Sequence, residues 1–361
     1  MERPVGESEP GNSATSRPVV VAVSMGDPLG IGPEIVAKVL TDPEIRNLAR
    51  FQIYGSESAM RRGAEAAGVG RFWRGEGEAG GGEGTPVLVE CGDGVEPPAG
   101  PPRPTAEGGK VSAAAVMRGI EACTRGGAMG GTGGVGEVGG ADALVTAPIS
   151  KESWSLAGVG FPGHTEMLAA ALGVERAAML FVGPSLRVIL VTIHVPLREV
   201  PRLVTAEKVF DAIELGARAC RELGVRRKGG ARVAVAGLNP HAGEGGLFGD
   251  EDERVIRPAV ERARAAGIDA SGPWPGDAVF LAAAKGNYDL VVAMYHDQGL
   301  IPVKLLDREE AVNVTVGLPI IRTSPAHGTA FDIAGRGVAS AASMKAAVRV
   351  AVGMAEQKLS V

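Results

Sequence analysis

The stretch "NYDLVVAMYHDQGLIPVK" (residues 287–304) begins as an apolar run and then stops on polar side chains. Its first part is rich in Val and Leu, which is typical of a strand buried on both faces of a parallel sheet. The run ends on Tyr295, His296, Asp297 and Gln298, with Lys304 shortly after. Two interpretations fit this pattern: a strand that surfaces into a solvated loop, or a ligand-binding cluster at the carboxyl end of a strand.

The rest of the chain alternates short β-branched runs with helical patterns, which predicts an α/β fold. Strands are expected at residues 18–25, 51–56, 141–148, 177–194 (a pair), 231–240, 288–296 and 311–321. Helices are expected at residues 32–45, 111–125, within 164–172, and at 206–223, 250–267 and 340–357. Such alternation predicts a largely parallel sheet with helices on both faces, whose ligands bind beyond the carboxyl ends of the strands.

Composition excludes several classes of protein. The 361 residues are 45% hydrophobic and 22% charged, as in a globular protein of two domains or one large α/β unit. The net charge of −5 offers no basic field for nucleic acid or anionic lipid, and the apolar runs are too short to cross a bilayer.

Three cysteines without a CxxC pair indicate a reducing, cytoplasmic location. Residues 1–17 are expected to be a disordered tail, and the glycine-rich stretches 74–86, 96–109 and 125–140 to be surface loops.

The histidines indicate where the chemistry lies. The chain has only five, and all follow predicted strands or stand in polar turns rich in Gly or Pro: His164, His194, His241, His296 and His327. Any one alone fits an ordinary surface or hydrogen-bonded core residue. Three imidazoles that converge from separate strands would make a divalent-metal site with coordination positions left for substrate. A ligating histidine also needs a partner for its other ring nitrogen, and Asp297 and Asp277 are candidates.

Other polar stretches leave alternatives open. "GDPLGIGPE" (residues 26–34) is either a phosphate cradle or a tight strand-to-helix turn with Pro33 at the helix start, and it matches neither GxGxxG nor a Walker motif. "GLNPHAGEGG" (residues 237–246) offers exposed amides to an anion in the same way. Lys304 and Arg322 follow strand ends and are either partners of a phosphate or carboxylate, or solvated surface charges.

Seven motifs in order identify a family. They are "GDPLGIGPE", "TAPISK", "GHTE", "GLNPHAGEGG", "YHDQGLIPVK", "VNVTVGLPIIRTS" and "HGTAFDIAGRG". Together they closely resemble the 4-hydroxythreonine-4-phosphate dehydrogenase family of pyridoxal phosphate biosynthesis. The resemblance runs from about residue 19 to 355, outside the glycine-rich insertions that precede residue 141.

The resemblance implies a fold and an assembly. The fold would be two α/β/α domains of the isocitrate and isopropylmalate dehydrogenase type, with the active site in the cleft between them. Residues 18–145 with 273–361 would form the first, cofactor-side domain, and residues 146–272 the second, with the dimerisation surface and metal ligands. The protein would be a homodimer with its active site at the interface. It would use NAD or NADP and one divalent ion per subunit (Zn²⁺, Mg²⁺ or Co²⁺).

The resemblance also implies residue roles. The metal ligands would be His194, His241 and His296. Substrate contacts would come from His164, Thr165, Lys304, Asn313 and Arg322. Cofactor contacts would come from Gly243 and Gly245, and from His327, Gly328, Thr329 and Asp332 in a loop that resembles the adenosine-binding loop of isopropylmalate dehydrogenases. Catalytic candidates are Lys304, Asp277 and Asp297, with the proton acceptor left open between the two carboxylates.

The implied reaction oxidises a phosphorylated hydroxy acid. 4-Phosphohydroxy-L-threonine would be oxidised at C3 to 2-amino-3-oxo-4-phosphobutanoate, a β-keto acid that loses carbon dioxide to give 3-amino-2-oxopropyl phosphate. A catabolic alternative acts on the 4-phosphates of D-threonate or D-erythronate, and Met167, Gly276 and Ala278 depart from the usual biosynthetic pattern. A remote alternative is phosphotransacetylase-like acyl transfer, which would need neither the three histidines nor the HGTAFDIAG loop. The sequence leaves open whether C2 of the substrate carries an amino group or a hydroxyl.

Overall fold

The computed structural model describes residues 17–360 apart from 80–81, 83, 93–94 and 130–137. Almost all of the expected tail 1–17, and the centre of the glycine-rich stretch 125–140, lie outside the described residues. Arg17, at the start of the described chain, pairs with the carboxylate of Asp142 at 2.5 Å. This contact joins the first described residue to the start of the segment predicted as a strand, 141–148.

Twelve described strands form one sheet, with the order β3-β4-β2-β1-β5-β12-β11-β6-β7-β10-β8-β9. The strands of its first half are β1 (Val20–Ser24), β2 (Arg50–Gly55), β3 (Arg74–Gly75), β4 (Val87–Glu90), β5 (Ala143–Thr146) and β12 (Ile321–Pro325). Those of its second half are β6 (Ala178–Val182), β7 (Arg187–Leu190), β8 (Val233–Ala236), β9 (Ala270–Trp274), β10 (Leu290–Ala293) and β11 (Val312–Val316). Most neighbouring pairs are parallel, so the predicted α/β class with a largely parallel sheet is confirmed.

The antiparallel pairs lie at the centre, where the two halves meet. β11 runs antiparallel to both β12 and β6, and β6 runs antiparallel to β7. The single strand expected over 311–321 is wrong, because the chain turns back after Val316 and restarts as β12 at Ile321. Gly317 has a φ of 94°, and a Cβ there would lie 2.2 Å from the carbonyl oxygen of Arg176. This turn therefore needs glycine, and Pro319 follows it.

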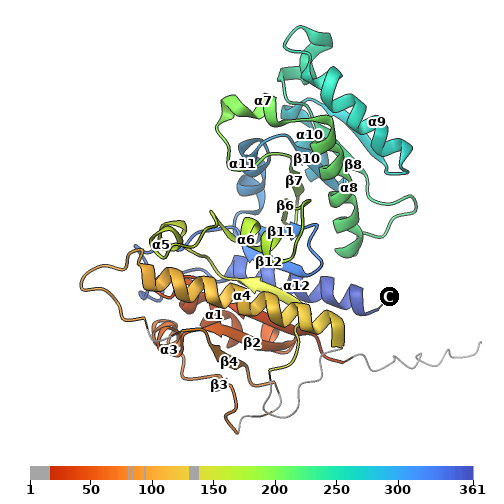
Figure 1. Ribbon diagram of the computed structural model, residues 1–361. Helices are drawn as coiled ribbons and strands as arrows, with labels where there is room; N and C mark the ends of the chain where they lie inside the picture. The colour runs from red at the N-terminus through yellow and green to blue at the C-terminus, as the bar shows by residue number, and fades with distance from the viewer. Residues whose placement is uncertain (1–16, 80–81, 83, 93–94, 130–137, 361) are drawn as a thin grey trace, which may run out of the picture.

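Helices cover both faces of the sheet (Figure 1). Around the first half lie α1 (Gly32–Leu40), α2 (Pro43–Arg46), α3 (Glu57–Ala66), α4 (Ala106–Met129), α5 (Lys151–Leu156), α6 (His164–Ala171) and α12 (Ala342–Leu359). Around the second half lie α7 (Val200–Leu203), α8 (Ala206–Glu222), α9 (Arg257–Ala265), α10 (Gly276–Ala284) and α11 (His296–Asp307). A 3₁₀ turn, Leu197–Glu199, precedes α7, and a short π-helical segment, Asp252–Ile256, leads into α9.

The faces of the sheet are packed by different helices. In the first half, α1, α3 and α12 share one apolar core, and α4, α5 and α6 form another. In the second half, α8 and α9 extend the first of these cores, while α10 and α11 pack on the other face. Successive residues of β10 alternate between the faces, so Val292 packs with α8 and Val291 with α11. The helices thus bury both faces, as a parallel sheet requires.

The opening stretch folds differently from its prediction after residue 293. β10 ends at Ala293, and His296 begins helix α11 rather than a loop. Strand pairing also places β10 between β7 and β8, in the second half of the sheet. The predicted second domain ended at residue 272 and therefore did not include β10. The division into two domains itself stays a prediction.

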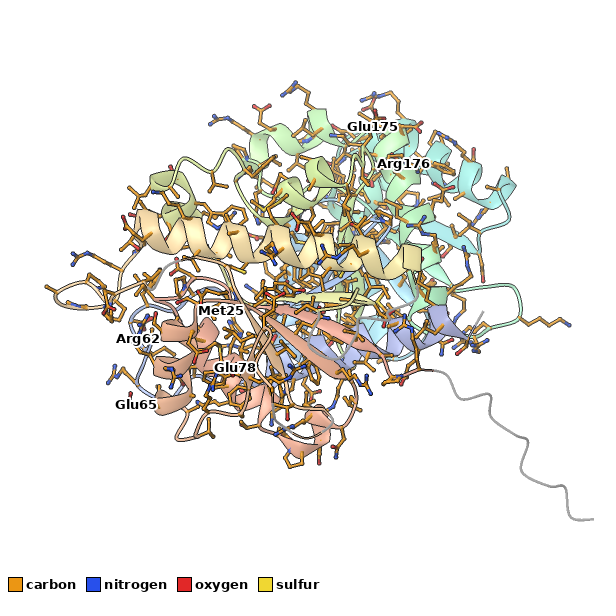
Figure 2. All side chains as sticks on the ribbon, turned by 60° about the horizontal axis from the view of Figure 1, so that its bottom comes forward. Met25, Arg62, Glu65, Glu78, Glu175 and Arg176 are labelled. Carbon is orange, nitrogen blue, oxygen red and sulfur yellow. The ribbon has the colours of Figure 1, made fainter. Side chains whose placement is uncertain are left out.

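The glycine-rich segment 26–34 is a buried turn, which agrees with the strand-to-helix interpretation and not with an open phosphate cradle. Met25, labelled in Figure 2, is fully buried just after β1, and Pro33 stands in the first turn of α1. The turn amides are used internally: Asp27 N donates to the carbonyl of Pro148 at 2.9 Å, and Ile31 N donates to that of Thr329 at 2.9 Å. These bonds tie the turn to two segments that border the cavities described next.

Candidate active site

A cavity of about 350 Å³ opens beyond the carboxyl ends of β5, β10 and β12, where an α/β fold places its ligands. We call it the histidine cavity. Among its lining residues are the sequence-predicted His164, Thr165, His194, His296, Lys304, Asn313, Arg322, His327 and Gly328. Segments more than 150 residues apart along the chain therefore meet in one place, as the resemblance implied.

His194 and His296 face each other in this cavity. Their ring centroids lie 5.5 Å apart, with the planes tilted by 42°. His194 follows β7 and His296 follows β10, and these strands are parallel neighbours. Because their carboxyl ends reach the same edge of the sheet, the two imidazoles converge. The polar end of the opening stretch is thus part of a cluster and not a strand surfacing into solvent.

Asp297 and Gln298 hold this end of the sheet together. The Nδ1 atom of His296 lies 2.7 Å from an oxygen of Asp297, which fixes the ring and leaves Nε2 for another partner. The Gln298 side chain accepts a hydrogen bond from Met294 N and donates one to the carbonyl of Gly237, both at 2.7 Å. Gln298 therefore joins the ends of β10 and β8.

His194 is kept neutral by its surroundings. Partial burial lowers its pKa, and the positive charge of Lys151 and the nearby His296 lower it further, while Glu166 acts in the opposite sense. A neutral imidazole has a free lone pair, which is the form that binds a metal ion. The pair formed by His194 and His296 therefore has the chemistry of two metal ligands.

His241 does not join this pair within one chain. It is exposed, and its ring lies 6.2 Å from that of Phe248, outside the histidine cavity. Its backbone is unusual, because residues 241–245 all have positive φ, including the non-glycine residues His241 (53°), Ala242 (53°) and Glu244 (42°). Each such residue costs roughly 1–2 kcal/mol relative to the right-handed form. Strain of this kind is commonly found at functional sites.

A metal ion fits two of the three predicted ligands. Among the described residues of one chain, no group of three or more His, Cys, Asp or Glu side chains is arranged to hold an ion. His194 and His296 converge, whereas His241 stands apart on the strained turn. A third ligand would have to come from a movement of this turn or from another copy of the chain.

Three buried polar atoms of residues that line the histidine cavity have no partner among the described residues. His164 Nε2, Asn313 Oδ1 and Arg322 Nε are all inaccessible and make no hydrogen bond. Buried polar groups in native proteins are almost always satisfied, so three such atoms lining one cavity indicate a polar ligand that completes them. Between them they offer both donors and acceptors, as a phosphorylated acid requires.

Arg322 is the strongest single anchor in this cavity. It is 2% exposed, and its two terminal nitrogens donate to the hydroxyls of Thr315 at 2.9 Å and Thr146 at 2.7 Å. Burial without a carboxylate partner lowers its pKa to about 9. The side chain is a fixed cation without a counter-charge, which is the form that suits a bound phosphate or carboxylate.

A second, wider cavity of about 1130 Å³ adjoins the first and shares His296, Leu300, Lys304, Ala326, His327 and Gly328 with it. His296, Leu300 and Lys304 are spaced four residues apart on α11 and so lie on one helix face. The wide cavity is also lined by the loop that follows β12, and is large enough for a dinucleotide.

The loop after β12 is fastened to α1. Glu34 is buried and accepts hydrogen bonds from the amides of Ala339 at 2.9 Å and Gly337 at 3.3 Å. Lys38 pairs with Glu34 at 2.9 Å and donates to the carbonyls of the same two loop residues. Of the predicted cofactor residues, His327 and Gly328 line the cavities, while Thr329 and Asp332 lie in the loop without lining them. Gly243 and Gly245 lie on the strained turn.

The sequence analysis missed two charged residues that line the histidine cavity, and two residues that it singled out, Met167 and Asp277, lie outside both cavities. Lys151 and Glu166 line the histidine cavity, and both stand inside quoted motifs ("TAPISK" and "GHTE") without having been given a role. Met167 is buried in the core and does not line the cavity, so it does not contact a ligand directly. Asp277 is exposed at the start of α10, outside both cavities, whereas Asp297 lines the wide one.

A pH-dependent stability is expected from His164. Burial and the Arg322 cation lower its pKa well below the ordinary value of 6.5. As the pH falls below 6.5, the unfolded chain binds a proton that the folded chain does not, so the free energy of unfolding decreases. Denaturant titrations from about pH 7.5 to 5.5 should show this loss, and His164→Gln should flatten it. His327→Gln is the control, because His327 is exposed; an unchanged slope in His164→Gln would contradict the assignment.

Comparison with known proteins gives consistent matches along the chain. Residues 50–351 match the family model described as pyridoxal phosphate biosynthetic protein PdxA. A 4-hydroxythreonine-4-phosphate dehydrogenase of Geobacter metallireducens is 47% identical over 346 residues, covering 94% of this chain and 96% of the relative. A D-threonate 4-phosphate dehydrogenase of Salmonella typhimurium is 41% identical over 354 residues, covering 93% and 98%. The crystal structure of 4-hydroxythreonine-4-phosphate dehydrogenase from Klebsiella pneumoniae superposes with a TM-score of 0.80 at 37% identity, covering 95% of this chain and 99% of that one.

Proposed function

The chain belongs to the PdxA family of pyridoxal phosphate biosynthetic proteins, and from this membership we infer that it oxidises 4-hydroxy-L-threonine 4-phosphate at C3 with a nicotinamide cofactor. The enzyme is a dehydrogenase acting on a CH–OH group. The alcohol loses a hydride from C3 and a proton from its oxygen. The resulting β-keto acid then loses carbon dioxide to give 3-amino-2-oxopropyl phosphate. The single observation that carries this proposal is the set of three unpartnered polar atoms, on His164, Asn313 and Arg322, in one cavity beside a histidine pair.

The chain's own residues bind and orient the substrate. Arg322 and His164 hold its anionic groups from the floor of the histidine cavity, and Thr165 and Asn313 add hydrogen bonds. Lys304 lies where the two cavities join and holds an anionic group close to the cofactor side. Fixing the phosphate and carboxylate in this way converts binding energy into orientation of C3.

The metal and nicotinamide sites are proposed from the same geometry. His194 and His296 are the ligands of a divalent ion, and the wide cavity with the loop 327–339 receives NAD or NADP. When bound, the ion supplies a Lewis acid and the nicotinamide ring a hydride acceptor. Asp297 orients His296 from the wide cavity and is the proposed proton acceptor, with Lys304, which lines both cavities, beside it on α11.

The site is completed by a second copy of the chain, which brings His241 to the pair formed by His194 and His296. Two features support a homodimer. His241 stands exposed on a strained turn, with no role inside its own chain. Helix α11, which supplies His296 and Lys304 to the site, also carries large exposed apolar side chains: Ile301 (58%) and Leu305 (78%) at the mouth of the wide cavity, and Leu306 (53%) outside it. Contiguous exposed apolar surface beside a site is typical of a subunit interface.

The biosynthetic substrate is favoured over the four-carbon sugar-acid phosphates by the charge of Glu166. Its carboxylate lines the histidine cavity, and no ion pair to it is found among the described residues. A substrate ammonium at C2 complements this charge, whereas a hydroxyl there does not. The D-threonate 4-phosphate dehydrogenase of Salmonella typhimurium, at 41% identity, makes that activity the second candidate.

A direct assay separates these candidates. NADH formation should be measured by absorbance with NAD and a divalent ion, using 4-hydroxy-L-threonine 4-phosphate and D-threonate 4-phosphate in parallel. We expect a higher kcat/KM for the amino substrate. Glu166→Gln should reduce that preference by about tenfold, the effect of losing one charge-assisted contact.

Two outcomes would contradict the proposal at different levels. No turnover with either phosphate would reject the dehydrogenase itself. An unchanged preference in Glu166→Gln, with turnover retained, would reject only the role given to the carboxylate. Ser155→Ala, on the neighbouring helix α5 and outside both cavities, is the matched control and should leave the preference unchanged.

A further inference from the structure

A third cavity, of about 930 Å³, lies apart from the catalytic residues except for Arg322 at its base. It is formed by the end of α8 and the loop after it, by the turn between β11 and β12, and by the last turn of α12. We call it the basic cavity. Because β12 starts here and ends at the histidine cavity, the two cavities lie at opposite edges of the sheet. Figure 1 shows the end of α8 above the C-terminal end of α12.

Positive charge is concentrated around this cavity. Its wall carries Arg221, Arg226, Arg227, Lys228 and Lys358. Among the described residues, Glu222 is the only carboxylate of the lining, and it lies 3.3 Å from Arg218. All five side chains are exposed, so water and salt screen their mutual repulsion, and together they give this cavity a positive rim in a chain of net charge −5.

Several of these cations remain available. Among the described residues, neither Arg221 nor Lys228 has a hydrogen-bond or ion-pair partner. Arg226 donates to the side-chain oxygen of Gln357 at 2.6 Å, and Lys358 only approaches the carbonyl of Pro319 at 3.5 Å. Among the ion pairs of the described residues, only one holds any of the five, that between Arg227 and Asp289 at 3.1 Å. At least three positive groups are therefore free to turn towards a ligand.

The interior of the basic cavity is apolar. Val225, Val316, Leu318, Ile320 and Met354 line it beneath the cations. Its volume lies in the range of small-molecule sites, roughly 300–1,000 Å³. An apolar floor under a cationic rim complements a molecule with a flat hydrophobic body and an anionic group. At the base lies Arg322, which is buried and also lines the histidine cavity.

We propose that the basic cavity binds a small phosphorylated aromatic molecule, with its ring on the apolar floor and its phosphate among Arg226, Lys228 and Lys358. The ligand bridges the two halves of the molecule, because Arg226 and Lys228 follow α8 whereas Lys358 ends α12. The bond between Arg226 and Gln357 already joins these elements. The site therefore stands beside the antiparallel β11–β12 pair that connects the halves.

Binding to the full-length protein tests this proposal without any turnover measurement. The probe is pyridoxine 5′-phosphate, an aromatic phosphate that has no aldehyde and so forms no imine with lysine. Its affinity should exceed that of unphosphorylated pyridoxine and that of inorganic phosphate by about tenfold each, because each lacks one half of the complementary contacts. AMP serves as a second aromatic phosphate. If AMP has the higher affinity, the cavity fits a nucleotide; if pyridoxine 5′-phosphate has the higher affinity, the cavity fits a smaller ring.

Variants assign the binding to the basic cavity. Arg226→Gln with Lys228→Gln should raise the Kd of the probe by at least about tenfold, with the melting temperature and the KM for substrate unchanged. The matched control, Arg61→Gln with Arg118→Gln, removes two exposed cations that line none of the three cavities. An unchanged Kd in the first pair, equal loss in the control pair, or displacement of all bound probe by the dehydrogenase substrate would overturn the proposal.

Discussion

A heterodimer made from one His194→Ala chain and one His241→Ala chain should recover about half of the wild-type turnover, although each variant is inactive by itself. In a symmetric dimer, each site would take His194 and His296 from one chain and His241 from its partner. The heterodimer then has one site with all three imidazoles and one site that lacks two. Each variant alone should lose kcat/KM by about a thousandfold or more, because the proposed ion would stabilise the developing charge by several kcal/mol.

The control for this experiment uses a different pair of variants. A heterodimer of His194→Ala and His296→Ala chains should stay inactive, because both residues belong to the same half of the site and each site then lacks one ligand. Differently tagged chains allow the heterodimer to be purified, and elemental analysis should find one bound ion per dimer in the first pair. If the first pair also stays inactive while its chains remain dimeric, the third ligand comes from within one chain and the proposed interface is wrong.

Arg322→Met should separate catalysis from stability. We expect kcat/KM to fall by about a hundredfold or more, because a buried charged partner of the substrate is lost. The free energy of unfolding at neutral pH should remain the same or increase. Burial lowers the pKa of Arg322 to about 9, below its value in the unfolded chain, so below pH 9 the folded protein carries a destabilising cation. Methionine removes that cation and roughly fills its volume.

Two measurements decide the Arg322 prediction. Steady-state kinetics give kcat/KM, and denaturant titration gives the free energy of unfolding of the same preparations. Arg322→Lys is the control, since lysine keeps the charge but does not reproduce the planar pair of bonds to Thr315 and Thr146. It should be impaired less than Arg322→Met. A large drop in unfolding free energy in Arg322→Met would show that the residue serves the fold more than the ligand.

The elements that were predictable are those whose signals are local. Alternating apolar runs predicted the α/β class, and strand ends predicted where polar residues would gather, because the carboxyl ends of parallel strands share one edge. The convergence of His194 with His296 follows from the pairing of β7 and β10, which lie about a hundred residues apart. Family resemblance implied that the two histidines share a metal site, but the strand pairing that brings them together was not predicted, since no local pattern encodes it.

The predicted element boundaries were wrong where two elements lie close together in the sequence or where tertiary packing determines the backbone conformation. Residues 311–321 look like one strand, yet the turn at Gly317 splits them because its backbone passes close to Arg176. The start of α11 could not be predicted from the sequence, because a buried strand ends and a helix begins within a few residues of Tyr295. Lys151 and Glu166 were overlooked for a different reason: a charged residue near a strand end is usually solvated, and only the three-dimensional cavity distinguishes these two.

The left-handed turn at residues 241–245 has a consequence for how this protein evolves. Glycine would adopt the backbone of His241 without steric penalty, so mutation towards glycine there would stabilise the isolated fold. With the metal role proposed for His241, selection for thermostability and selection for the imidazole would act in opposite directions at this position. In an inactive descendant, relaxed selection would let glycine replace the histidine without a cost to the fold.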